Sequence, residues 1–127
     1  MAKSGDQKLK LFYLVNIFSD YTDGEHSLTM QEIIEKLAEC GIKAERKSIY
    51  SDISELHKYG IEIIGQQKNR TYYYHIENRL FSNEELSLII NAVLESDAVS
   101  EDRSKEIIEK LKSFASIYDG DKLLKDF

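Results

Sequence analysis

Apolar residues in the stretch 43–60 recur on one side of a predicted helix, which we place at about residues 44–59. At about 100° per residue, Ile49, Ile53 and Leu56 fall on one narrow stripe. The opposite side carries the polar residues Lys47, Ser51, Ser54 and Lys58. A helix with such an outer face has the composition of a recognition helix, whose N-terminal residues contact base edges in the major groove of DNA. An ordinary amphipathic surface helix shows the same pattern, so this stretch alone leaves both interpretations open.

Apolar residues at three- and four-residue spacing predict an earlier helix over residues 7–19. They are Leu11, Leu14, Val15 and Phe18. Residues 20–27 lack this periodicity and contain several turn formers, which predicts a loop.

A second helix is predicted over residues 30–40 by signals at both of its ends. Thr29 and Glu32 have the spacing of a capping box, and Gly41 can adopt the left-handed conformation that ends a helix. Only residues 41–43 separate this helix from the next one. That spacing is expected of a helix-turn-helix.

A β-hairpin is predicted after the third helix. Residues 61–65 and 71–76 are rich in β-branched and aromatic side chains, and residues 66–70 between them are polar. A hairpin directly after a helix-turn-helix is the wing of a winged helix. The side chains of the predicted loop that suit backbone phosphates or a minor groove are Lys68, Asn69 and Arg70. A plain solvated loop has the same composition.

Three consecutive tyrosines, Tyr72, Tyr73 and Tyr74, lie in the second predicted strand. Because side chains alternate along a strand, Tyr72 and Tyr74 face one side and Tyr73 faces the other. We expect either Tyr73 or the other two to cover the helices. A stacking platform for single-stranded nucleic acid is the alternative.

Two further helices are predicted in the last third of the chain. Ser82 and Glu85 repeat the capping box, and the helix that they begin runs to about Glu95. Ser100 begins the next helix, and the short loop between them predicts an antiparallel helical hairpin. Its apolar side chains exceed what two helices bury in each other, which implies a further partner surface.

The charge distribution bears on a nucleic-acid partner. The net charge is −6, which at first argues against DNA, because phosphate neutralisation needs clustered Lys and Arg. Residues 80–127, however, hold 6 basic and 11 acidic side chains, whereas residues 40–75 carry a local balance of +2. Such a patch predicts modest electrostatic attraction to phosphates.

The amino-acid composition also bears on the cellular compartment of the protein and on whether it is an enzyme. No apolar run approaches the roughly 20 residues that cross a bilayer, so we expect a cytoplasmic protein without a membrane partner. Cys40 is the single cysteine, which excludes an internal disulfide, and we expect it to be mostly buried near a helix end. The histidines, none with a partner at metal-binding spacing, are His26, His57 and His75. With no glycine-rich phosphate loop or nucleophile elbow, we expect neither an enzyme nor a bound metal or cofactor.

Residues 47–63, KSIYSDISELHKYGIEI, resemble the N-terminal winged helix of bacterial WYL-domain transcription regulators, which are DeoR-like. Lys47, Ser48 and Asp52 match the basic, Thr/Ser and Asp positions of that family's pattern, whereas Ser51 stands where the family often has Arg. The resemblance covers residues 8 to about 118. It implies a cytoplasmic, dimeric DNA-binding regulator, with any effector ligand bound by a sensor domain that these residues do not include.

These patterns together predict an α+β, mainly α fold. A winged helix-turn-helix of three helices and a β-hairpin wing is expected over residues 7–78. A two-helix antiparallel hairpin over residues 79–127 is expected to follow it as a linker or dimerisation segment.

We expect sequence-specific binding of double-stranded DNA by a transcriptional regulator that forms a homodimer. The recognition helix would lie in the major groove, and the wing, residues 65–70, on the backbone or in the minor groove. The predicted DNA-binding residues are Arg46, Lys47, Ser48, Tyr50, Ser51, Ser54, Lys58, Lys68, Asn69 and Arg70. Asp52 is expected to be a structural pairing partner. The alternative is a winged helix that contacts only other proteins.

Overall fold

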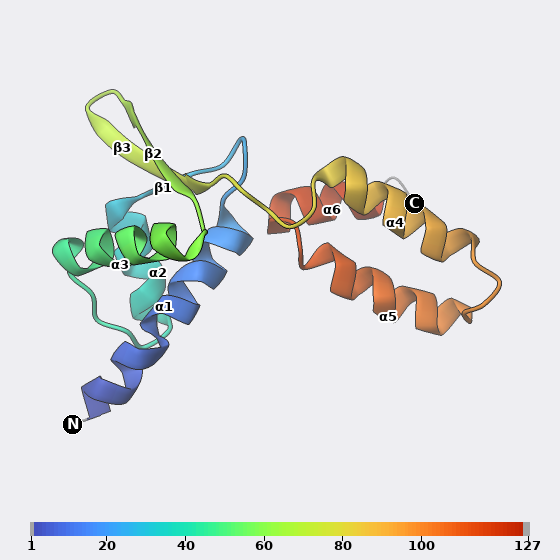
Figure 1. Ribbon diagram of the computed structural model, residues 1–127, viewed down its shortest axis with the longest axis horizontal. Helices are drawn as coiled ribbons and strands as arrows, with labels where there is room; N and C mark the ends of the chain where they lie inside the picture. The colour runs from blue at the N-terminus through green and yellow to red at the C-terminus, as the bar shows by residue number, and fades with distance from the viewer. Residues whose placement is uncertain (1, 126–127) are drawn as a thin grey trace. The chain divides into compact units, whose positions relative to one another are not determined.

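The chain divides into two compact units, Met1–Asn78 and Arg79–Phe127. A computed structural model describes the backbone of residues 2–125 and the side chains of residues 8–123. It is mainly helical with one small antiparallel sheet, which confirms the predicted α+β class (Figure 1). In the part of the chain that is described, no helix is both long and apolar enough to cross a bilayer.

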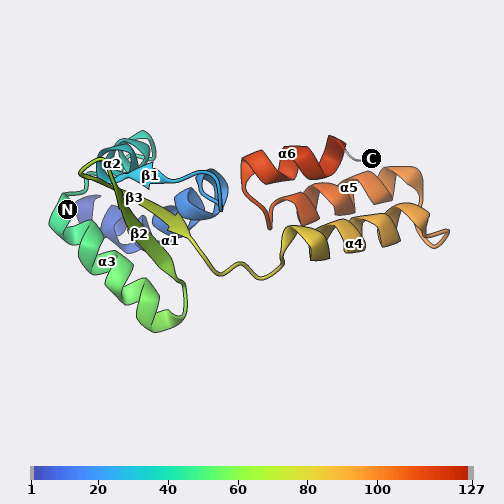
Figure 2. The same ribbon diagram turned by 90° about the horizontal axis from the view of Figure 1, so that it is seen from above.

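The first unit contains three helices and a three-stranded sheet in the order β1-β3-β2 (Figure 2). The helices are α1 (Ala2–Tyr21), α2 (Met30–Glu39) and α3 (Arg46–Tyr59). The strands are β1 (Leu28–Thr29), β2 (Ile63–Lys68) and β3 (Thr71–Ile76). Strand β1 was not predicted, because two residues, of which the second is the N-cap of α2, are too few to show an alternating pattern.

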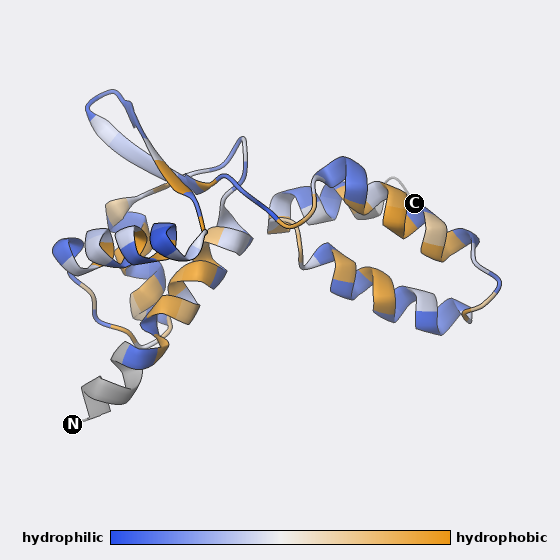
Figure 3. Cartoon of the chain, viewed as in Figure 1, coloured by the Kyte–Doolittle hydropathy of each residue, from blue (hydrophilic) through white to orange (hydrophobic). Residues whose placement is uncertain are grey.

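The core of this unit forms where the apolar stripes of the three helices meet β3. The stripe of α1 is visible as the orange band in Figure 3. The buried residues of the core as a whole include Leu14, Ile17, Phe18, Ile33, Leu37, Ile42, Ile49, Leu56 and Tyr74. Leu11, predicted to be in the stripe, is exposed, because at that level of α1 the side chain of Lys10 is buried instead.

The local signals around α2 are confirmed. The Thr29 hydroxyl accepts from the Glu32 amide at 3.2 Å, and the Thr29 amide donates to the Glu32 carboxylate at 2.9 Å. Gly41 has a φ of 81°, the left-handed conformation expected after a helix. Ile42 fills the corner between α2 and α3 and is 2% exposed.

Two predictions near this corner are wrong. The α3 helix begins at Arg46 and not at residue 44, because Glu45 has the extended conformation of an N-cap residue and no side-chain cap bond marks it. The turn is therefore longer than three residues. Cys40 is exposed, because it caps the end of α2 and Ile42 occupies the corner.

The wing has a tighter turn than predicted, because β2 spans Ile63–Lys68 in place of residues 61–65, whereas β3 covers the predicted residues 71–76. Lys68 pairs with Thr71, so Asn69 and Arg70 alone form the loop in place of residues 66–70. Both have positive φ, 53° and 67°, as the two central residues of a type I′ hairpin turn do. The prediction failed because polar residues are able to form ladder pairs where both faces of a hairpin are exposed.

The second unit contains three helices instead of the predicted two. They are α4 (Asn83–Glu95), α5 (Glu101–Lys112) and α6 (Ile117–Lys125). The Ser82 and Glu85 capping box is confirmed, and the Ser100 hydroxyl caps α5 by accepting from the Arg103 amide at 3.1 Å. Helix α6 supplies part of the partner surface that the apolar content implied, since Leu123 packs in one cluster with Leu86, Ile90, Ile108 and Ala115.

Gly65 lies directly opposite Tyr74 in the wing, and its missing side chain makes room for the tyrosine ring. A Cβ atom at Gly65 would lie 2.8 Å from Cε1 of Tyr74, a buried ring that has little space to move. We predict that Gly65→Ala lowers the free energy of unfolding by about 1–3 kcal/mol. Gly24→Ala is the matched control, because no atom lies within 4 Å of the added Cβ. Equal stability of the two variants in urea denaturation would contradict this account.

Candidate nucleic-acid interface

Helix α3 presents most of the predicted DNA-binding residues on its exposed side. Those exposed on α3 are Arg46, Lys47, Tyr50, Ser51, Ser54 and Lys58. Lys58 lies twelve residues after Arg46, which is about 18 Å along the helix. It forms an exposed ion pair with Glu55 at 3.2 Å. Lys58 is thus placed at the far end of the helix from the other cations.

The flank of α3 that faces α1 is held by a buried lysine. Lys10 is only 5% exposed, and its Nζ lies 2.8 Å from an Asp52 carboxylate oxygen. The same Nζ donates to the Ser48 hydroxyl at 2.8 Å, and that hydroxyl donates to the Glu45 carbonyl at 2.9 Å. Asp52 is therefore a pairing partner within the protein, as expected. Ser48, predicted to bind DNA, has its hydroxyl engaged inside the unit.

Sequence reasoning missed Lys10, although a signal was present. Lys10 lies four residues before Leu14 and eight before Phe18, on the side of α1 that is buried. A lysine on a buried helix face requires an acidic partner. Asp52, at the edge of the α3 stripe, was the available candidate.

The opposite flank of α3 faces a row of tyrosine rings. The ring centroids of Tyr50 and Tyr74 are 6.5 Å apart, and those of Tyr74 and Tyr72 are 6.4 Å apart. Tyr74 is buried, whereas Tyr50 and Tyr72 are 43% and 52% exposed. Of the two packing alternatives for the tyrosines, the structure has Tyr74 in the core and Tyr72 on the same side but at the surface.

Hydrogen bonding links this row to the first turn of α3. Hydrogen bonds from Tyr74 and Arg46 lower the pKa of Tyr50. Burial, together with the hydrogen bond to Tyr50, raises the pKa of Tyr74 to about 12.

The wing turn and the start of α3 line one groove. This open groove of about 390 Å³ is bounded by Arg46 and Tyr50 on α3 and by Arg70, Thr71 and Tyr72 on the wing. The third wall is the start of α2, from Thr29 to Gln31. The structure therefore brings together three of the predicted residues, Arg46, Tyr50 and Arg70. The exposed side chains of Lys47, Ser51, Ser54, Lys68 and Asn69 do not line it.

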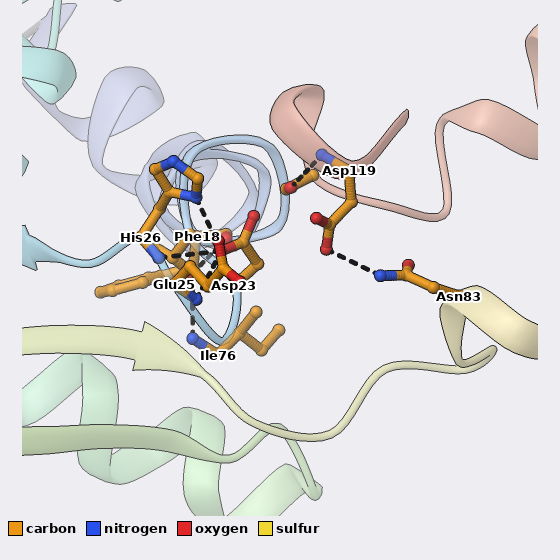
Figure 4. A network of polar contacts seen from close by, with 9 residues as sticks. Phe18, Asp23, Glu25, His26, Ile76, Asn83 and Asp119 are labelled. Carbon is orange, nitrogen blue, oxygen red and sulfur yellow. Dashed lines mark hydrogen bonds and ion pairs between the residues drawn. The ribbon is translucent and has the colours of Figure 1, made fainter. Parts of the chain in front are cut away.

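A polar network fixes the base of the wing to the loop after α1 (Figure 4). The Thr22 hydroxyl accepts from the Ile76 amide at 3.0 Å and donates to the Phe18 carbonyl at 2.6 Å. One carboxylate oxygen of Asp23 accepts from the His26 amide and lies 2.8 Å from His26 Nδ1. This loop thereby anchors the last residue of β3 to α1. Figure 4 also shows a contact within the second unit, from Asn83 to Asp119 at 3.0 Å.

The ion pair of Lys10 is expected to matter for stability more than the exposed pair of Lys58. Lys10→Met leaves Asp52 partly buried without its cation, and we predict a loss of about 3 kcal/mol in the free energy of unfolding. Lys58→Met removes an exposed pair and should cost less than about 1 kcal/mol. Chemical denaturation of both variants measures the difference. Similar losses would show that the Lys10 pair does not hold α3.

The raised pKa of Tyr74 predicts a decline in stability at alkaline pH. The unfolded chain ionises this tyrosine above pH 10.0, whereas the folded unit keeps it neutral up to about pH 12. Its contribution is therefore complete below pH 10 and is lost as the pH rises to about 12. We predict that the wild-type protein loses unfolding free energy relative to Tyr74→Phe across this range. The control Tyr59→Phe removes a hydroxyl from a side chain that is 84% exposed, and it should retain the wild-type decline.

Comparison with known proteins points to the same region of the chain. Residues 13–69 match the family model described as the FokI D3 domain, and the match extends from α1 through β2. Searches of curated proteins and of solved structures gave no match. The matched region is similar to a DNA-binding, winged-helix-like domain, which supports DNA as a partner.

Proposed function

We propose that the protein binds double-stranded DNA sequence-specifically and regulates transcription. The observation that carries this proposal is the groove shared by α3 and the wing turn, since it places Arg46 and Arg70 on two elements around one space. A winged helix uses these two elements on one duplex, with α3 in the major groove and the wing on the backbone or in the minor groove.

The exposed side chains divide between two kinds of contact. Lys47, Ser51 and Ser54 lie on the outward side of α3, where hydroxyl and ammonium groups can reach base edges. Arg46, Lys68 and Arg70 are exposed around the wing and suit phosphates. Ser48 would contribute to binding by fixing the position of α3, because its hydroxyl already forms hydrogen bonds with Lys10 and Glu45.

The regulatory role and the assembly rest on the resemblance to WYL-domain regulators. It supports a binding protein of the cytoplasm and not an enzyme, acting as a homodimer on two half-sites. In this proposal any effector ligand binds a sensor domain outside these residues, and the helices α4 to α6 link that domain to the winged helix.

A protein-interaction module without DNA binding is the second candidate. The net charge of −6 favours it, because an acidic chain attracts phosphates weakly. The two candidates differ in their response to salt. Contacts to phosphates release counterions and give affinities that fall steeply with ionic strength, whereas a mainly apolar protein contact does not.

Duplexes selected from a random pool at near-physiological salt test the proposal. With phosphates held by Arg46, Lys68 and Arg70, we predict a slope of log affinity against log salt of about −3. Lys47→Ala should weaken binding and relax the preference at the base pair that Lys47 contacts. It should leave the thermal transition unchanged, because Lys47 is exposed.

Lys105→Ala is the matched control. It removes the same charge from an exposed position on α5 and should bind as the wild type does. Recovery of no duplex from the pool, or an affinity that does not depend on salt, would contradict DNA binding. Equal losses of binding and thermal stability in Lys47→Ala would show that Lys47 is structural.

A further inference from the structure

The groove between α3 and the wing turn is cationic in a protein that is acidic as a whole. Arg46 and Arg70 line it, and none of the described residues that line it is acidic. This concentration of positive charge favours an anionic ligand over a neutral one.

The start of α2 adds to the attraction for an anion. The capping box satisfies the amides of Thr29 and Glu32. The amides of Met30 and Gln31, the first two positions of the helix, have no carbonyl partner within α2. They belong to the positive end of the helix dipole, and both residues line the groove.

Tyr50 lines the groove together with the two arginines and is 43% exposed. Its ring centroid lies 6.5 Å from that of Tyr74, and interactions with Tyr74 and Arg46 lower the pKa of its hydroxyl. The phenol has one proton that it can donate to a ligand. Tyr74 is buried and its ring lies against Gly65, so the ring beside Tyr50 is fixed in place.

We infer that Tyr50 donates a hydrogen bond to a phosphate oxygen of one DNA strand, which lies in this groove between Arg46 and Arg70. The inference rests on the proposed function and moves Tyr50 from the base-reading set to the backbone contacts. Tyr74 lines the same groove and is a positioning residue for this contact, because its buried ring packs beside the Tyr50 ring. The bases are then read by the outward residues Lys47, Ser51 and Ser54.

A phosphate-by-phosphate replacement on the selected duplex tests this contact. Each phosphate in turn is replaced by a neutral methylphosphonate, and binding of the full chain is measured for the wild type, Tyr50→Phe and Tyr59→Phe. We expect Tyr50→Phe to bind about tenfold more weakly with unchanged base preference, since it loses one hydrogen bond to a charged group. Tyr59→Phe should bind as the wild type does, because Tyr59 does not line the groove.

The test compares the loss of affinity caused by each methylphosphonate in the wild type with the loss in Tyr50→Phe. At one phosphate the methylphosphonate should cost the wild type more than it costs Tyr50→Phe, because the variant has already lost that contact. Equal costs at every phosphate would overturn the inference, and so would a changed preference at one base pair in Tyr50→Phe. If the wild type binds no selected duplex, the proposed function itself fails. Thermal denaturation verifies that Tyr50→Phe is folded. We expect it to fold, because the substitution keeps the aromatic ring.

Discussion

The attachment of α3 on both of its flanks is the constraint on which the rest of the first unit depends. The buried ammonium group of Lys10 holds Asp52 and Ser48 on one side, and the Tyr74 ring and hydroxyl hold Tyr50 on the other. Rotation of the helix about its axis would break an ion pair in a poorly hydrated site, which is costly. The packing of the unit, and not the ligand, therefore decides which side chains of α3 are available for binding.

This attachment explains how an acidic protein can present a site for DNA. The positive charge is not spread over the surface but is concentrated at the first turn of α3 and at the wing turn, where Arg46 and Arg70 line one groove. The excess of acidic side chains belongs to residues 80–127. Long-range attraction to DNA is therefore expected to be modest, and affinity should come mainly from a few well-placed contacts.

Local signals in the sequence predicted much of the fold, because the residues that form each signal lie within a few positions of the helix end that they determine. The capping boxes at Thr29 and Ser82 and the left-handed Gly41 each involve neighbours along the chain, and all three are confirmed. The start of α3 was misplaced because Glu45 makes no side-chain cap bond. Helix α6 was not predicted, because Gly120 and the polar residues around it weaken the helical pattern. Leu124 and Phe127 lie outside the residues whose side chains are described.

The candidate site was predicted as a set of residues but not as an arrangement. The pairing of Lys10 with Ser48 joins residues 38 positions apart, and the meeting of Tyr50 with Tyr74 depends on the register of the wing strands. The two-residue turn at Asn69 and Arg70 has positive φ without glycine, so the usual sequence signal for it was absent. Contacts of this kind arise only when the tertiary fold is complete.

The central claim is that the outer side of α3 and the wing turn contact one duplex at the same time. Backbone amide chemical shifts, measured while the selected duplex is added to the full chain, test it most directly. We predict that the shifts change together, at the same duplex concentration, at Lys47 and Ser51 on α3, at Arg70 and Thr71 on the wing, and at Gln31. Changes confined to residues 83–125, or to α3 without the wing, would contradict it.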